Sequence, residues 1–401
     1  MPQGPFARRA ARLSSVLPAA PSEHAISFDS GHAFPELLPD LTSAAQSALS
    51  RYRSEALQYG PKTGLPELRS WIVEYSGQDG VEISRDQVLV TNGAKHAIEL
   101  VCRLLLDEGD SIVVTAPTYF TAIPIFRSFG VSFIEVGQDR EGLDVDELEG
   151  RLRQLDRDGK EMPKFIYNVP EFHNPTGITM SLERRRALIE LATRRGIFVV
   201  EDSPYRRIRF EGEDIPPLKS LDRGERVFHI GTFSKLMAPG LRVGWVSASA
   251  EMIARMTQLK SDGGSCPLTQ RIVVEFCAGG QLAAHGQRVR KTYRAHRDRM
   301  VECVSDQVPQ VSVNVPSGGY YLWLTLPPDM DGDALAKQAT DAGVHVLAPS
   351  KCYAYPDGGH SKNHIRLAFS HATTDEIEKG VHRLASAFRA ISSRTAAAAA
   401  R

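Results

Sequence analysis

From about residue 87 onward, the sequence alternates short apolar runs rich in β-formers with segments of helical pattern. The apolar runs include QVLVTN (87–92), SIVVTAP (111–117), KFIYNVP (164–170), IFVVED (197–202) and RVFHIGTFSK (226–235). Helical patterns such as SLERRRALIELATRRG (181–196) lie between them. Alternation of this kind is typical of βαβ units, in which helices cover both faces of a sheet. The sequence therefore predicts an α/β fold with a mainly parallel central sheet.

Polar, aromatic or glycine residues follow five of these predicted strands. They are Gly93, Tyr119, Asn174, Asp202 and the pair Ser234-Lys235. Sites in parallel sheets lie in the crevice at the carboxyl ends of the strands. We therefore expect these side chains to share one site.

A chain of 401 residues exceeds what one hydrophobic core organises, so we expect more than one domain. The pattern changes near residue 285, where a long charged helical segment leads into short strands and helices of a smaller α+β unit. We predict an N-terminal arm (1–57) that packs on the small domain, a large domain (58–285) and a small C-terminal domain (286–401).

Bulk composition narrows the class of protein. The formal net charge is zero, which gives no general attraction to nucleic acid or to anionic membranes. No apolar run approaches the roughly 20 residues that span a bilayer. The five cysteines are odd in number and scattered, which favours a reducing compartment and no metal site. We expect a cytoplasmic protein with small-molecule substrates and no nucleic-acid or membrane partner.

The segment GTFSKLMAPGLRVGW (231–245) places Lys235 close to Thr232, Ser234 and Arg242. A phosphorylated aldehyde would explain this set, because an amine can form an imine while hydroxyls and a guanidinium hold a phosphate. A solvated turn after a buried strand is the alternative. Asp202 ends an apolar strand, where a carboxylate is costly unless it is paired. It could instead cap the following turn.

Four motifs in the same order resemble fold-type-I pyridoxal-phosphate (PLP) enzymes. They are YNVPEFHNPTG (167–177), VVEDSPY (199–205), GTFSKLMAPGLRVGW and HIRLAFS (364–370). The sequence is most similar to class I/II aminotransferases, in the branch of 2-aminoadipate transaminases and the effector domains of MocR-type regulators. The resemblance extends from residue 26 to residue 371. It implies a homodimer with PLP as cofactor.

The resemblance implies a role for each motif residue. Lys235 would be the Schiff-base lysine, Asp202 the partner of the pyridine nitrogen, and Tyr205 with Asn174 the donors to the phenolic oxygen, so that the catalytic set is Lys235, Asp202 and Tyr205. Tyr119 would stack on the ring, although a plain core aromatic is possible. The phosphate site would comprise Gly93, Ala94, Lys95, Thr232, Ser234 and Arg242, with Tyr59 reaching the neighbouring subunit unless it is a packing residue. Gly31, Asn174 and Arg366 would bind the substrate, with Arg366 on its α-carboxylate.

We expect transfer of an amino group from an α-amino acid to a 2-oxo acid. β- or γ-elimination, replacement or carbon-bond formation with the same cofactor is the alternative. Lys95 and His173 stand where relatives often carry Gln, and we expect both near the substrate side chain, where they could support that alternative. A ligand-sensing module of a transcription regulator is less favoured, because only about 25 residues precede the catalytic unit.

Overall fold

The computed structural model describes residues 6–13 and 25–399, with side chains described as far as residue 393. Its largest sheet has seven strands in the order β2, β10, β9, β8, β7, β3, β4. All run parallel except β10, which is antiparallel to both of its neighbours. The strands are β2 (Val88–Thr91), β3 (Ser111–Thr115), β4 (Ser132–Val136), β7 (Phe165–Asn168), β8 (Phe198–Asp202), β9 (Val227–Thr232) and β10 (Gly244–Ser247).

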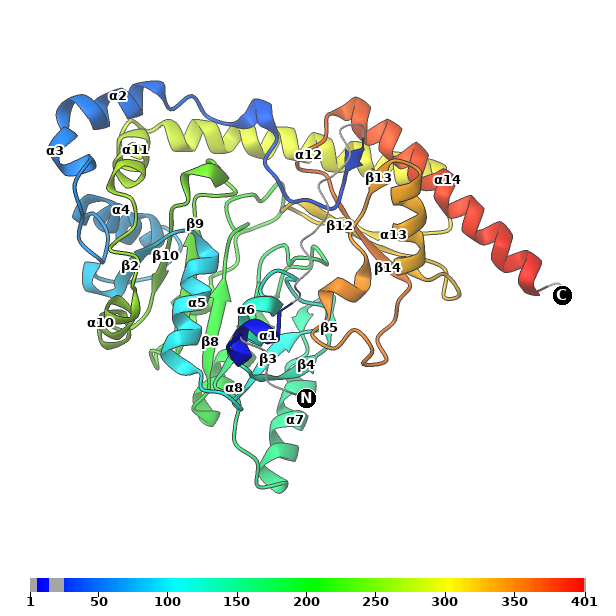
Figure 1. Cartoon of the computed structure of the whole chain (residues 1–401), viewed down its shortest axis with the longest axis horizontal. Coiled ribbons are helices and arrows are strands. Elements are labelled where there is room, and N and C mark those ends of the chain that lie inside the picture. Colours follow the sequence, from blue (N-terminus) through cyan, green and yellow to red (C-terminus); the bar gives the residue numbers. More distant parts are fainter. Residues whose placement is uncertain (1–5, 14–24, 400–401) are drawn as a thin grey trace.

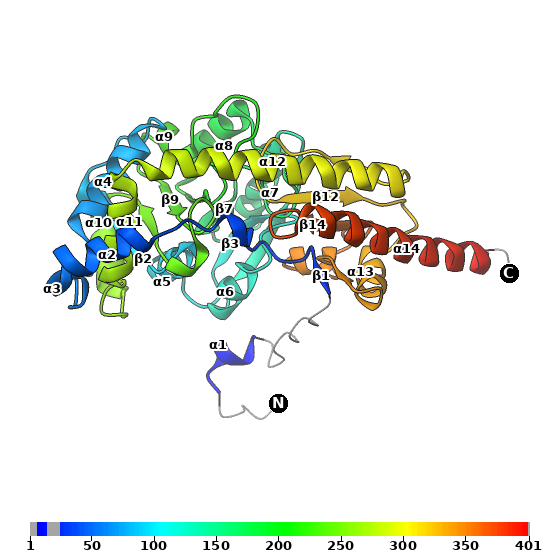
Figure 2. The ribbon, with the colours of Figure 1, turned by 90° about the horizontal axis from the view of Figure 1, so that it is seen from above.

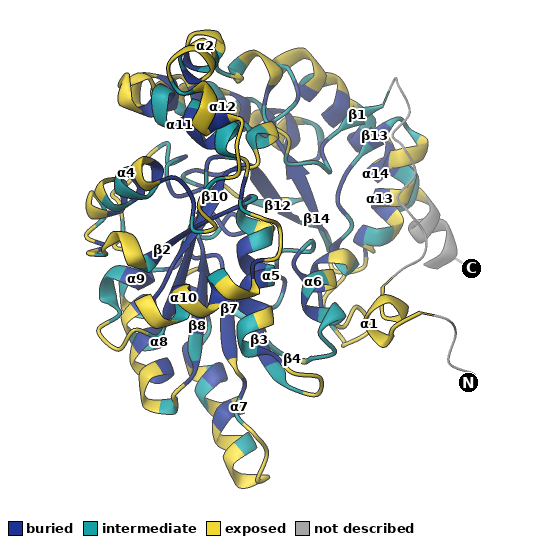
Figure 3. Ribbon diagram, turned by 60° about the vertical axis from the view of Figure 1, so that its left-hand side comes forward, coloured by how far each residue is buried: buried dark blue, intermediate teal, exposed yellow. Residues whose placement is uncertain are grey.

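Helices cover both faces of this sheet (Figure 1, Figure 3). Successive residues of a strand point to opposite faces, so Ile112 and Val114 join one core cluster and Val113 joins another. The first face packs on α5 (Ala94–Leu105), α6 (Ile123–Ser128) and α10 (Ala250–Leu259). The second packs on α7 (Val145–Arg157), α8 (Leu182–Arg195), α4 (Pro66–Gly77) and α11 (Pro267–Ala278). This arrangement confirms the predicted α/β fold with a mainly parallel sheet.

Local sequence signals set the limits of the predicted helix over 181–196. The Ser181 side chain accepts a hydrogen bond from the Arg184 amide at the start of α8. Gly196 ends it in the left-handed region, with φ of 69°, where glycine carries no steric penalty. The helix therefore begins and ends where its capping residues stand.

The C-terminal part contains a second, antiparallel sheet. Its strands are β11 (Ser312–Asn314), β12 (Tyr321–Thr325) and β14 (His364–Ala368), in that order. Helices α13 (Gly332–Asp341) and α14 (Thr374–Ala399) belong to this part, and α12 (Gln281–Gln307) extends from it along the large sheet (Figure 1, Figure 2). The smaller elements are α1 (Arg8–Ala11), α3 (Arg53–Ala56), α9 (Leu218–Leu221), the hairpin β5 (Gln138–Asp139) and β6 (Gly142–Leu143), and four 3₁₀ turns, Pro35–Leu37, Arg85–Gln87, Pro239–Leu241 and Pro349–Cys352.

The N-terminal segment touches both parts. Strand β1 (Ile26–Ser27) pairs with β13 (Val344–His345) of the C-terminal part. Helix α2 (Thr42–Arg51) instead packs on α11, beside the large sheet. The 285/286 boundary falls inside α12, so that helix joins the two parts without a linker. The division into 1–57, 58–285 and 286–401 stays a prediction. None of the helices in the described ranges is long and apolar enough to cross a membrane.

Candidate active site

A cavity of about 360 Å³ opens at the carboxyl ends of the parallel strands. Asp202 ends β8 and Thr232 ends β9, and both line this cavity. Its walls also include Ala94, Lys95, Tyr119, Asn174, Tyr205, Ser234, Lys235 and Arg242, together with His32, Ile98, Val169, Pro204 and Pro239. The topology therefore brings most of the predicted site residues together.

Lys235 extends into the cavity three residues after the end of β9. Its Nζ donates a hydrogen bond to the Gly31 carbonyl over 2.8 Å, and Tyr320 holds its backbone by donating to the Lys235 carbonyl over 2.8 Å. Burial lowers the pKa of Lys235, and the nearby Arg366 and Arg242 cations lower it further. A lowered pKa increases the fraction of neutral amine, which is the nucleophilic form.

Asp202 is a buried carboxylate with one free oxygen. Tyr167 donates to its Oδ2 over 2.7 Å, while Oδ1 has no hydrogen-bond partner among the described residues. Burial raises the pKa of Asp202 to about 6, although the Tyr167 hydrogen bond and the Lys235 charge act in the opposite direction. A free oxygen on a buried carboxylate fits a cationic N–H donor of a ligand.

Asn174 presents a free amide N–H₂ to the cavity. Arg366 Nη1 donates to its Oδ1 over 2.8 Å, which fixes the orientation of the amide. Its buried Nδ2 then has no partner within the described part of the chain. Tyr205 lies on the neighbouring loop, and its hydroxyl donates to that of Tyr321 over 3.2 Å. The Asn174 amide can therefore donate to a bound acceptor. Tyr205 can donate to the same acceptor when its hydroxyl hydrogen turns away from Tyr321, because the Tyr321 hydroxyl can then donate to Tyr205.

Arg366 lies in β14, on the C-terminal side of the cavity. Its guanidinium contacts the Asp29 carbonyl and lies 4.1 Å from the centroid of the Tyr321 ring. The Arg366 side chain is almost completely buried, and its Nε has no partner among the described residues. A buried guanidinium with an unused N–H is suited to a carboxylate.

Cationic and hydroxyl groups gather at the opposite end, around the start of α5. Gly93 caps this helix with φ of 86°, and Arg242 Nη2 donates to the Asn92 carbonyl over 2.9 Å. Thr232 donates to the Ser234 hydroxyl over 2.9 Å. Burial lowers the pKa of Lys95, as do the Arg242 and Lys235 charges. Helix-terminal amides, hydroxyls and cations together fit a phosphate.

Comparison with known proteins identifies the family. The sequence model of aminotransferase class I and II matches residues 23–384. The chain belongs to the class I and II aminotransferases. It is 33% identical over 383 residues to aromatic-amino-acid aminotransferase 1 of Thermococcus litoralis. The matched residues are 94% of this chain and 91% of the relative.

Two further relatives extend the comparison. A solved α-aminoadipate aminotransferase from Thermus thermophilus, in complex with N-(5′-phosphopyridoxyl)-L-leucine, is 31% identical with a TM-score of 0.87, covering 97% of this chain and 98% of the other. An uncharacterized HTH-type transcriptional regulator of Bacillus subtilis is 29% identical over 343 residues, 85% of this chain and 69% of the regulator. The likeness to 2-aminoadipate transaminases and to MocR-type regulators is thereby confirmed.

The aminotransferase uses pyridoxal 5′-phosphate, as the sequence predicted. The cavity fits this cofactor on three independent features. The amine of Lys235 suits its aldehyde, the free oxygen of Asp202 suits its protonated ring nitrogen, and the cationic end of the cavity suits its phosphate. Transamination of an amino acid with a 2-oxo acid is the activity of the family.

Five predicted residues are not part of the cavity wall. Three of them lie directly behind it: the Gly31 carbonyl accepts from Lys235, Arg366 donates to Asn174, and a Cβ at Gly93 would meet the Arg242 guanidinium. The other two are Tyr59 and His173. Tyr59 of the aminotransferase is 88% exposed and borders a separate hollow beside Pro267. His173, which we expected near the substrate side chain, is not part of the cavity wall. It is buried between Thr115 and Thr176, whose hydroxyls lie 3.0 Å from its Nε2 and Nδ1. Burial lowers the pKa of His173 to about 3, so the imidazole is neutral near neutral pH.

Several residues of the aminotransferase site were not found from sequence. Tyr167 supports Asp202, Tyr321 supports Tyr205, and His32 lines the cavity. The tyrosine inside the apolar run KFIYNVP is a weak signal for the contact of Tyr167 with Asp202, because the hydroxyl of a buried tyrosine usually needs a partner. Nothing in the sequence indicates which partner it finds.

Proposed function

We propose that the aminotransferase works in two half-reactions within this cavity, with Lys235 as covalent anchor and proton carrier. The observation that carries the proposal is the enclosure of the Lys235 amine in the same cavity as the free oxygen of Asp202. An α-amino acid would donate its amino group in the first half-reaction, and a 2-oxo acid would accept it in the second.

Bound PLP supplies an aldehyde for the amino group and a ring that accepts electron density from the substrate Cα. Asp202 would hold the proton on the ring nitrogen through Oδ1, which keeps the ring cationic. Lys235 Nζ, once released from the cofactor, would take the proton from the substrate Cα and return it to the cofactor carbon. Its lowered pKa supports this role, because a base must be neutral to accept a proton.

Arg366 would bind the substrate α-carboxylate, and the Gly31 backbone would border the substrate on the same side. A Cβ at Gly31 would lie 2.0 Å from the Tyr321 hydroxyl, so only glycine lets the backbone approach this closely. We expect amines that lack the carboxylate to be poor substrates, because the buried Nε–H of Arg366, which has no acceptor among the described residues, would then stay unpaired.

We also propose a homodimer with shared sites, in which Tyr59 binds the phosphate of the neighbouring subunit. Its high exposure beside Leu57, which is 60% exposed, supports this proposal, since large exposed apolar groups often mark interfaces. A Tyr59→Phe variant should remain dimeric by sedimentation and bind PLP more weakly. A cytoplasmic location stays a prediction.

Borohydride reduction in the presence of PLP, followed by peptide mapping, tests the anchor. We expect the pyridoxyl label on Lys235, loss of the label in Lys235→Ala, and its retention in the control Lys95→Gln. Turnover should fall by at least about 10²-fold in Lys235→Ala, since general acid–base catalysis alone typically contributes about 10²–10⁴-fold. A label on another lysine of the wild type would refute the assignment.

A single-turnover experiment tests the reaction. An amino donor without acceptor should change the cofactor absorption once, in stoichiometric amount, and a 2-oxo acid should restore it. Release of a leaving group with the aldehyde cofactor regenerated in each cycle would instead support elimination or replacement.

A further inference from the structure

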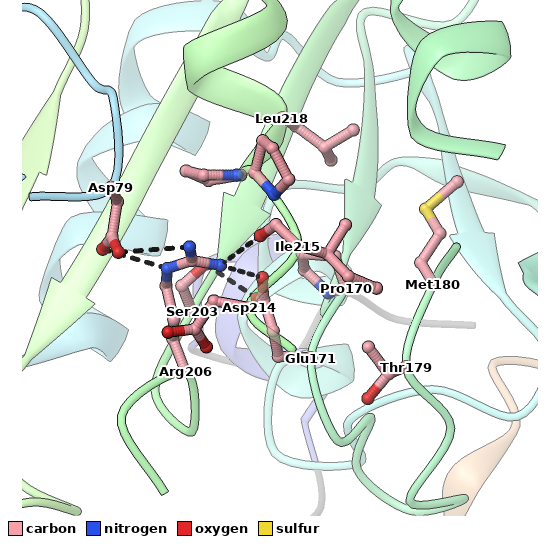
Figure 4. Close-up of polar contacts among 12 residues, drawn as sticks. Asp79, Pro170, Glu171, Thr179, Met180, Ser203, Arg206, Asp214, Ile215 and Leu218 are labelled. Atoms are coloured by element: carbon pink, nitrogen blue, oxygen red, sulfur yellow. Dashed lines mark hydrogen bonds and ion pairs between the residues drawn. The ribbon is translucent and has the colours of Figure 1, made fainter. Parts of the chain in front are cut away.

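Asn174 and Tyr205 stand on two neighbouring loops that a buried ion pair joins. The loop of residues 170–180 carries Asn174 and begins two residues after β7 ends, and the loop of residues 203–208 carries Tyr205 and follows β8. Arg206 Nη1 donates to Glu171 Oε1 over 2.7 Å (Figure 4). The guanidinium immediately after Tyr205 therefore binds the carboxylate three residues before Asn174.

The Glu171 end of this bridge is held by helix α8. Arg185 Nη1 donates to Glu171 Oε1 over 2.7 Å. The same guanidinium binds the carbonyls of Pro170, over 3.3 Å, and Met180, over 3.0 Å. Arg185 thus fixes both ends of the loop that carries Asn174.

The Arg206 end is fixed as firmly. Its Nε lies 2.9 Å from Asp79 Oδ2, and its Nη1 donates to the Ile215 carbonyl over 2.7 Å (Figure 4). Glu171 and Arg185 are completely buried, and Arg206 is 6% exposed. Each guanidinium in the network therefore has several fixed acceptors and little freedom to move.

This network does not reach the cofactor cavity itself. Glu171, Arg185 and Arg206 are absent from the cavity wall, whereas Asn174 and Tyr205 line it. A buried ion pair is a poor way to gain stability, because desolvation offsets much of its attraction. What such a pair supplies instead is a fixed separation between the two loops that it joins.

We propose that Glu171 and Arg206 are positioning residues, which set the separation of the Asn174 amide and the Tyr205 hydroxyl and thereby the protonation equilibrium of the bound cofactor. This inference rests on the proposed roles of Asn174 and Tyr205 as donors to the phenolic oxygen. Two donors at hydrogen-bond distance stabilise the anionic form of that oxygen. The bonds weaken steeply as distance and angle depart from their optimum, so a looser pair of loops favours the protonated form.

The test is a pH titration of the cofactor absorption in the reconstituted holoenzyme. In Arg206→Gln and in Glu171→Gln, we expect the midpoint to rise by about 0.5–1 pH unit, because the anionic form loses hydrogen bonds. The double variant should shift no further than either single variant, since both remove the same bridge. Arg206→Lys keeps the charge without the fork and should shift the midpoint less; it also serves if Arg206→Gln fails to fold.

Arg207→Gln is the matched control. Arg207 follows Arg206 in the chain and its Nη2 donates to the same Asp79 over 2.9 Å, but no contact joins it to Glu171. We expect this variant to lower the melting temperature of the apoprotein and leave the midpoint unchanged. A midpoint that moves equally in Arg207→Gln would overturn the inference, as would an unchanged midpoint in folded Arg206 and Glu171 variants.

Asn174→Ala separates this inference from the roles on which it rests. A shifted midpoint in Asn174→Ala, with none in the Arg206 and Glu171 variants, would keep the donor role of Asn174 and reject the bridge. An unchanged midpoint in Asn174→Ala would reject that donor role and the bridge with it. Labelling of Lys235 is independent of both outcomes.

Discussion

Asp202 and Glu171 are both buried carboxylates close to the cofactor cavity, yet their pKa values move in opposite directions. Burial raises the pKa of Asp202 to about 6, and a neutral tyrosine hydroxyl is the partner of one of its oxygens. The Arg185 and Arg206 guanidiniums more than offset the same burial at Glu171 and lower its pKa to about 2. The direction of the pKa shift therefore depends on the hydrogen-bond partners of the carboxylate and not on how deeply it is buried.

Glu201, the residue before Asp202, adds a third case. It accepts two backbone hydrogen bonds, from Leu218 and Lys219, over 2.7 and 2.8 Å. Burial and the nearby Glu171 charge still raise its pKa to about 7. The Arg185 charge and the two backbone donors lower the pKa of Glu201 without offsetting these effects. Asp202, like Glu201, has no cation as a hydrogen-bond partner among the described residues, and only Asp202 of the three carboxylates faces the cavity, where a cationic ligand can stabilise its charge.

The largest effect on stability is expected at Glu171, whose buried charge is compensated by two guanidiniums. Glu171→Gln should lower the free energy of unfolding by about 3 kcal/mol or more at neutral pH, because two buried guanidiniums lose their shared anion. The folded pKa lies below the unfolded value, so the wild-type advantage is full above about pH 4.5 and shrinks as pH falls towards 2. Urea denaturation at pH 8 and pH 4 measures this. An equally stable variant at pH 8 would show that the pair contributes no net stability.

In the apoprotein, Asp202→Asn should raise the free energy of unfolding, whereas Glu171→Gln should lower it. The folded pKa of about 6 exceeds the ordinary aspartate value of 3.8, so ionisation costs stability as pH rises from about 4 to 6. The difference corresponds to about 3 kcal/mol. We expect the variant to be more stable than the wild type at pH 8 and similar near pH 4, by urea denaturation without PLP.

The same substitution should cost activity. Removing one directed electrostatic partner from an enclosed site typically lowers turnover by about 10²–10³-fold. Exchange of the substrate Cα proton with deuterated solvent reports this step directly. Wild-type exchange in Asp202→Asn would separate the free oxygen of Asp202 from the chemistry, and would leave its raised pKa without a functional explanation.

The sequence predicted the fold and the ends of the strands well, because alternation and strand-end residues are local signals. Asp202, Lys235 and Gly93 stand where the βαβ pattern places them. The order of strands in the sheet is not a local property, and neither is side-chain direction within a turn. His173 and Asn174 are adjacent in HNPTG, yet Asn174 faces the cavity while His173 packs against Thr115 and Thr176.

The Glu171–Arg206 pair illustrates the same limit. EFHNPTG and SPYRRI each read as a turn, and nothing in either motif indicates that they bind one another. Tyr167 and Asp202 meet because β7 and β8 pair with Tyr167 opposite Val200, which the sequence alone does not specify. The resemblance to a family supplied roles for the residues that face the cofactor, but not for the buried residues that position them.

The smallest expected effect concerns the cationic end of the cavity. There, the hydrogen-bond partners of Arg242 in the described part of the chain are the carbonyls of Pro239 and Asn92. Gly93 has φ of 86°, and a Cβ there would lie 2.5 Å from Arg242 Nη2. Gly93→Ala should cost about 1–3 kcal/mol of stability, because φ of 86° with ψ of 170° is a backbone conformation essentially restricted to glycine. It should also weaken PLP binding by about tenfold, equivalent to about 1.4 kcal/mol, because Arg242 must move away from Asn92.

Gly150 in α7 is the control for this prediction. A Cβ there meets nothing within 4 Å, so Gly150→Ala should stabilise the protein by about 0.5–1 kcal/mol. Equal PLP affinity in the Gly93 and Gly150 variants would mean that Arg242 does not bind the phosphate from its present position.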